Sequence, residues 1–97
     1  MDSRSPDPFQ KFRELLDQTY QFPCTYLHKF IGKNSPIFLS SVADFEKKFI
    51  GLTRTLERKS ASAAHVALTY DYLAASAEDV ILLTVETQKI NDLIYIL

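Results

Sequence analysis

One stretch of the chain decides its fold: FPCTYLHKFIG, residues 22–32. Its side chains alternate strictly after the proline, and a period of two is typical of a β-strand. The two faces of the predicted strand carry Tyr26, His28 and Phe30 on one side and Leu27, Lys29 and Ile31 on the other. Because both faces include apolar side chains, we predict a central strand at residues 24–31. Gly32, Lys33 and Asn34 are expected to form the turn that ends it.

A helix is predicted directly after this turn, at residues 35–50. Ser35 is a favourable N-cap residue, and Pro36 suits the first helical position. Apolar side chains then recur at helical spacing from Phe38 onward. Gly51 is expected to end the helix, because glycine readily adopts the backbone conformation that follows a helix C-terminus.

The rest of the chain, after this helix, is predicted to form four more elements. Residues 52–59 alternate and contain β-branched threonines, which favours a second strand. One face of that strand is expected to carry Leu52, Arg54, Leu56 and Arg58. A third strand is predicted at 64–73, a helix opened by Ser76 at 76–88, and a last strand at 93–97.

The segment before the central strand is predicted to form one short helix. Asp7 and Pro8 resemble an N-cap and a first-turn proline, and apolar residues follow at helical spacing, so we place this helix at 8–19. Residues 1–7 are polar and are expected to be flexible. We therefore divide the chain into residues 1–21, a flexible start with the N-terminal helix, and residues 22–97, the folded domain.

The order of the elements in residues 22–97 is β-α-β-β-α-β, which is the ferredoxin-like pattern. It predicts an α+β fold with a four-stranded antiparallel sheet in the order 4-1-3-2 and two helices on one face. The helix at 8–19 is additional to this pattern. The opposite face of the sheet is left uncovered by helices.

The composition limits the function classes. The chain has 97 residues, enough for one domain, and a formal net charge of -1, which favours neither nucleic acid nor anionic membranes as a partner. Lys and Arg predominate in residues 1–59 and Asp and Glu in residues 60–97, a split compatible with one basic face. A single cysteine, no apolar signal-peptide core and no long apolar run lead us to expect a cytoplasmic protein without disulfides or membrane contact.

No catalytic set is evident in the sequence. Cys24 and His28 lie four residues apart on one predicted strand, about 13 Å along its axis, so local spacing cannot make them a nucleophile–base pair. We interpret Cys24 as a small buried residue, His28 as a histidine at the edge of the core and His65 as a surface residue. We predict no enzymatic activity, no cofactor and no metal site.

Several residues resemble those of a known family. Phe22-Pro23-Cys24, Tyr26, Lys29, Ile31-Gly32 and the hydrophobic strand at 92–97 are similar to the YbeD-like family of small bacterial proteins, which is uncharacterised in function. The resemblance covers roughly residues 22–97. It implies a ferredoxin-like fold similar to that of ACT domains, which are regulatory domains that bind amino acids beside metabolic enzymes.

ACT domains bind their ligands at the turn between the first strand and the first helix. The resemblance therefore implies a small-molecule site at Gly32, Lys33, Asn34 and Ser35, where free backbone N–H groups at a helix N-terminus could hold a carboxylate. The acidic residue that ACT domains place beside the glycine is missing from this turn. On this interpretation the chain is a non-catalytic regulatory domain that senses a metabolite.

Two alternatives involve the uncovered face of the sheet. The first is association with a protein or with a second copy in a homodimer, through Leu27, Ile31, Ala67, Ile94 and Ile96. The second and less favoured alternative is RNA binding, in which exposed rings stack on bases. The candidate rings are Tyr26, Phe30, Tyr70, Tyr72 and Tyr95, but the chain lacks the basic-glycine-aromatic motif of RNA-recognition domains at 65–70.

Overall fold

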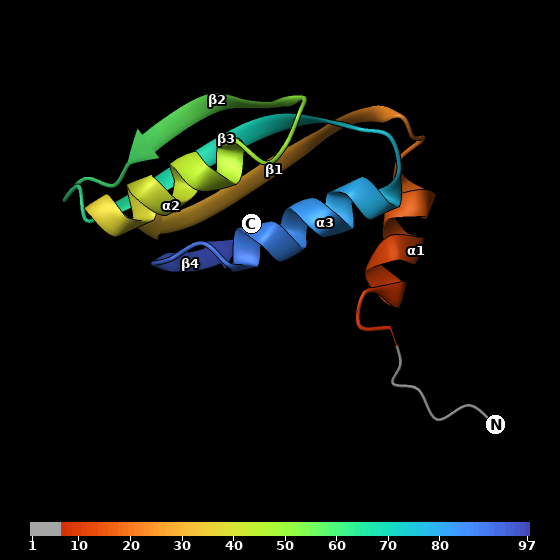
Figure 1. Ribbon diagram of the computed structural model, residues 1–97, viewed down its shortest axis with the longest axis horizontal. Helices are drawn as coiled ribbons and strands as arrows, with labels where there is room; N and C mark the ends of the chain where they lie inside the picture. The colour runs from red at the N-terminus through yellow and green to blue at the C-terminus, as the bar shows by residue number, and fades with distance from the viewer. Residues whose placement is uncertain (1–6) are drawn as a thin grey trace.

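The computed structural model describes residues 7–97 of the chain (Figure 1). Its elements are α1 (Gln10–Thr19), β1 (Cys24–Lys33), α2 (Pro36–Glu46), β2 (Leu52–Lys59), β3 (His65–Ala74), α3 (Ala77–Gln88) and β4 (Leu93–Ile96). The predicted α+β class, with a four-stranded antiparallel sheet and a helix before the first strand, is confirmed. The flexible start predicted at residues 1–7 lies, except for Asp7, outside the described residues.

The sheet has the strand order β2-β3-β1-β4. The central strands β1 and β3 are paired along their whole lengths, from Cys24 opposite Ala74 to Lys33 opposite His65. This pairing confirms the prediction that the first strand is central. The short β4 pairs only with the C-terminal part of β1.

One face of the sheet is covered by α2 and α3, which lie on the same side of it in Figure 1. Phe30 of β1 lies under α2, with its ring centroid 6.3 Å from that of Phe38 and 5.7 Å from that of Phe45. His28 of the same strand reaches Thr87 of α3. The alternation of β1 therefore places its predicted aromatic face in the core, as hydrophobic burial requires.

The strand β1 is longer than the sequence predicted, and the role of its glycine is different. Gly32 lies within the strand, opposite Val66 of β3, and the turn begins only at Asn34. A Cβ atom on Gly32 would lie 2.1 Å from the Phe38 ring. The glycine is needed because the ring of α2 packs directly onto the β1 backbone, and the prediction that Gly32 forms the turn is wrong.

The helix α2 begins as predicted but ends earlier. Ser35 is its N-cap, and the Ser35 hydroxyl accepts a hydrogen bond from the Phe38 N–H. The helix ends at Glu46 instead of residue 50, and Phe49 packs on Tyr72 from the connecting segment. Gly51, with φ of +82°, makes the turn into β2.

A β-bulge in β2 changes which side chains share a face. Arg54 lies opposite Tyr70 of β3, but the next paired residue is Leu56, opposite Thr69. One extra residue, Thr55, therefore reverses the alternation. Arg54 points to the helix-covered side and Leu56 to the other side, so the prediction that they share one face is wrong.

The N-terminal helix α1 packs against α3. Figure 1 shows α1 beside the end of α3 that is farther from β4. Leu16 of α1 is buried with the core residues, and Arg13 forms ion pairs with Glu78 of α3 and with Asp7. Within residues 7–97, no helix combines the length and the apolar character needed to cross a membrane.

Candidate functional site

The sheet face opposite α2 and α3 is called the open face here. Its members follow from the strand register, because residues opposite one another in paired strands point to the same side. The open face consists of Thr53, Leu56 and Arg58 of β2, His65, Ala67, Thr69, Asp71 and Leu73 of β3, Thr25, Leu27, Lys29, Ile31 and Lys33 of β1, and Tyr95 of β4.

Large apolar side chains on the open face are exposed. Leu73 and Leu27 are 68% and 63% exposed, and Tyr95 and Leu56 are 50% and 47% exposed. Ala67, Ile31 and Tyr95 form a continuous row, because Ile31 lies opposite each of the other two. Apolar side chains gathered on one face in this way are typical of a surface that contacts a partner.

The predicted interface residues are only partly on this face. Leu27, Ile31 and Ala67 lie on it, as predicted. Ile96 lies opposite Phe30 and packs against the core, so its assignment to the open face is wrong. The cause is an irregularity between Ile31 and Gly32, which shifts the register of β4 and brings Tyr95 onto the open face.

The remaining predicted interface residue, Ile94, is 43% exposed. It lies between the paired residues Leu93 and Tyr95, at the irregularity in the register, and has no partner in β1. The structure therefore gives it no clear place in the row of apolar side chains on the open face.

The open face is also positively charged. It carries three cationic side chains, those of Lys29, Lys33 and Arg58, and a single carboxylate, that of Asp71. None of these four residues takes part in an ion pair between described residues. The ion pairs between described residues lie within or next to the helices and on the helix-covered side of β2.

Two adjoining hollows lie on the open face, with volumes of about 230 and 170 Å³. The first is lined by Lys29, Leu56, Arg58, Ala67 and Thr69. The second is lined by Ile31, Arg58, Lys59, Ser60, His65 and Ala67. They share Arg58 and Ala67, so a cation and a small side chain lie where the two hollows meet.

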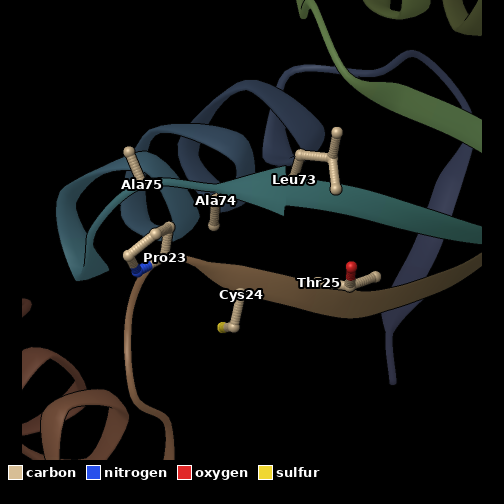
Figure 2. Close-up of a pocket in the computed structure, with 6 residues that line it drawn as sticks. All are labelled: Pro23, Cys24, Thr25, Leu73, Ala74 and Ala75. Atoms are coloured by element: carbon tan, nitrogen blue, oxygen red, sulfur yellow. The ribbon is translucent and has the colours of Figure 1, made fainter.

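A third hollow, of about 290 Å³, lies at the other end of the sheet, where β1 begins and β3 ends. Figure 2 shows Thr25 and Leu73 on one side of the sheet and Cys24 and Ala74 on the other. Its side chains do not converge on a common point, and Cys24 is half-buried with no base among the lining residues. The arrangement offers no catalytic centre.

The turn predicted to bind a small molecule has its donors in use. The Lys33 N–H donates to the Asp92 carbonyl, and the Asn34 N–H donates to the Ala64 carbonyl, each at 3.0 Å. The Asn34 side-chain amide donates to the Ala63 carbonyl at 2.9 Å. The backbone groups that the sequence suggested were free are hydrogen-bonded to the loops beside them.

A carboxylate of the chain itself occupies the N-terminus of α2. The Ser35 hydroxyl donates to Asp92 Oδ2 at 2.8 Å while it accepts from the Phe38 N–H. Asp92 lies 57 residues farther along the chain than Ser35, and its carboxylate takes the place beside this turn. No local sequence pattern links the two positions.

His28 is a core residue with no access to a substrate. It is 2% exposed, and its Nε2 lies 2.9 Å from the Thr87 hydroxyl. That hydroxyl donates to the Leu83 carbonyl, so it accepts from His28 and fixes the proton on Nε2. Burial lowers the pKa of His28 to about 4, which keeps the ring neutral.

Most of the rings considered for RNA stacking lie on the helix-covered side of the sheet and not on the open face. Tyr26, Phe30, Tyr70 and Tyr72 point to the helix-covered side, and of the five rings only Tyr95 belongs to the open face. Stacking on two or three rings of the sheet is therefore not available on the open face.

Comparison of the chain with protein-family models, with curated proteins and with solved structures gave no match. Among residues 7–97 there is no group of three or more side chains arranged to hold a metal ion. The fold and its surface define a small α+β domain whose most distinctive surface is an apolar and basic sheet face.

Proposed function

We propose that the chain is a non-catalytic binding domain that holds a protein partner on its open face. The observation that carries this proposal is the exposure of Leu27, Leu73 and Leu56 on one side of the sheet. Complete burial of a fully exposed leucine side chain contributes about 1.5–3 kcal/mol, and each of these leucines retains roughly half or more of its exposed surface for a partner to cover.

The proposed fold family is the ferredoxin-like one. Read from β4, the strand order β2-β3-β1-β4 is β4-β1-β3-β2, which is the order expected for that arrangement and supports the assignment. Membership of the YbeD-like family and similarity to ACT domains stay predictions. Proteins of this fold have many functions, so the functional proposal rests on the surface and not on the fold.

The second interpretation, a regulatory domain with a metabolite at Gly32–Ser35, has less support. A carboxylate ligand would have to displace Asp92 from the Ser35 hydroxyl and would find the Lys33 and Asn34 N–H groups already bonded. A thermal-shift titration with amino acids tests it. A rise in melting temperature that Ser35→Ala abolishes would favour the metabolite site over the open face.

The open-face proposal is tested by a pull-down experiment in which the wild-type chain and the variant Leu27→Asp are each immobilised as bait. The matched control is Leu15→Asp, which places the same charge on α1 at a leucine that is 58% exposed. We expect a partner that the wild type and Leu15→Asp hold and Leu27→Asp does not, and that binds again when purified. A partner that Leu27→Asp still holds, or no partner at all, contradicts the proposal.

Sedimentation of the same three proteins at two concentrations identifies a second copy as the occupant. A homodimer that Leu27→Asp dissociates and Leu15→Asp leaves intact would place another copy of the chain on the open face. If all three proteins are monomers, the occupant of the open face is a different protein and not a second copy.

A further inference from the structure

We propose that the hollow lined by Lys29, Arg58 and Thr69 on the open face binds an acidic side chain of the partner, with an apolar partner residue beside it. This inference rests on the proposed function and deepens it, because it names the chemistry of the partner. The partner segment is one that presents aspartate or glutamate beside an apolar residue on the same side of its backbone, as residues two positions apart do in an extended chain.

The shape of the hollow comes from side-chain size across three strands. Ala67 on the central strand β3 lies opposite Arg58 of β2 and Ile31 of β1. Because alanine is short, it leaves a depression between the longer side chains on either side. The volume of about 230 Å³ accommodates one carboxylate-bearing side chain.

The chemistry of the hollow is that of a carboxylate site. Arg58 from β2 and Lys29 from β1 approach it from opposite sides, and Thr69 on β3 lies between them with its hydroxyl as a further donor. A guanidinium can bind both oxygens of a carboxylate at once. Leu56 adds an apolar wall for the neighbouring residue of the partner.

The β-bulge at Thr55 is what brings Arg58 to this place. Arg54 before the bulge points to the helix-covered side, where it binds Glu46 and Glu57. With regular alternation Arg58 would lie on that same side. Bulges often redirect side chains at functional surfaces, and this one moves a cation and a leucine onto the open face.

The charges argue for an acidic partner and against a second copy. Two open faces in contact would bring together two sets of Lys29, Lys33 and Arg58, with one Asp71 carboxylate from each copy. The resulting repulsion opposes self-association, whereas an acidic segment neutralises the same cations. The second hollow shares Arg58 with the first, so acidic side chains of the partner in either hollow can reach the same guanidinium.

The experiment measures fluorescence anisotropy of a labelled leucine–glutamate peptide, in which leucine and glutamate take turns at every second position with threonine between them, so that both side chains point to one side of an extended chain. Matched peptides replace glutamate with glutamine or with lysine. The leucine–glutamate peptide is expected to bind at least about tenfold more tightly than the other two, because each charge-assisted hydrogen bond is stronger than a neutral one. Its affinity should fall as salt is added.

Two variants locate the binding to the hollow. Arg58→Glu is expected to weaken the leucine–glutamate peptide by about tenfold or more. Lys47→Glu makes the same change of charge on an exposed residue after α2 and is expected to have less than about a twofold effect. Arg58→Gln removes the positive charge without reversing it and should give an intermediate loss of affinity. Circular dichroism verifies that each variant is folded.

The failure of this inference differs from the failure of the proposed function. Equal binding of the three peptides, no effect of Arg58→Glu, or no binding of the leucine–glutamate peptide at millimolar concentration overturns the acidic partner. Tighter binding of a labelled single-stranded RNA than of the peptide overturns it as well. The proposed function fails separately, if Leu27→Asp leaves partner binding unchanged.

Discussion

The two faces of the sheet differ in whether their side chains find partners within the chain. On the helix-covered face, His28 and Tyr70 are buried and hydrogen-bonded to Thr87 and Glu46. On the open face, leucines are exposed and the cations have no ion-pair partner among the described residues. The covered face is satisfied within the chain and stabilises the fold, whereas the open face is left with interactions that only a partner can complete.

The largest expected difference between the two faces is in the free energy of unfolding, when an aromatic ring is removed from the helix-covered face. Phe30 contacts Phe38, Phe45 and Tyr70 and is completely buried. Phe30→Ala should lower the free energy of unfolding by about 3–5 kcal/mol, a large part of the stability of a small domain. Urea unfolding measures the change.

The control for that prediction is Leu27→Ala, three positions away on the same strand and on the open face. Its cost should stay within about 0.5 kcal/mol, because the side chain is already exposed. Similar costs for the two variants would contradict the division of the sheet into a buried and an open face.

The second prediction concerns pH. The unfolded chain binds a proton at His28 near its ordinary pKa of 6.5, but the folded chain does so only near 4. Stability should therefore fall as the pH drops from about 6.5 toward 4, by about 3 kcal/mol in total for this group. Urea unfolding at several pH values measures the slope.

Two histidine variants isolate that slope. His28→Gln should remove most of the pH dependence in this window, while the amide can still donate to Thr87. His65→Gln, at an exposed position on the open face, should leave the slope of the wild type. An unchanged slope in His28→Gln would assign the pH dependence to other groups.

The third prediction tests the contact between α2 and the β1 backbone. Gly32→Ala should cost about 1–3 kcal/mol, because the added methyl group meets the Phe38 ring. A second change, Phe38→Ala, removes the ring atoms that the methyl group would meet, so Gly32→Ala should add little cost in that background and the two costs would not add. Additive costs would show that Gly32 is required for a reason other than this ring.

Much of the fold could be predicted from local patterns, and the errors have a common origin. The alternation of β1, the Ser35 N-cap and the order of the elements depend on neighbouring residues, and they were predicted. The bulge at Thr55 depends on how β2 pairs with β3. One extra residue reverses every later side chain, and no nearby sequence signal announces it.

The candidate site was harder to predict for the same reason. Leu27, Ile31 and Ala67 follow from simple alternation and were placed correctly on the open face. Arg58, Leu56 and Tyr95 reach that face only through irregular pairing in β2 and β4. The contact of Ser35 with Asp92 joins segments far apart in the sequence, so it too requires the folded chain.

The smallest predicted effect gives the sharpest comparison, because it uses two arginines of one strand. Arg54 donates to Glu46, which also accepts from the Tyr70 hydroxyl, and its guanidinium lies over the Tyr70 ring. Arg54→Gln should therefore cost about 1 kcal/mol of stability, a modest value because the side chain is partly exposed. Arg58→Gln should cost less than about 0.5 kcal/mol, because Arg58 has no such partners within residues 7–97.

Peptide affinity should show the opposite order, with Arg58→Gln weakening binding of the leucine–glutamate peptide and Arg54→Gln leaving it unchanged. If both variants altered stability and affinity alike, the bulge between them would not separate a structural cation from one that serves a partner.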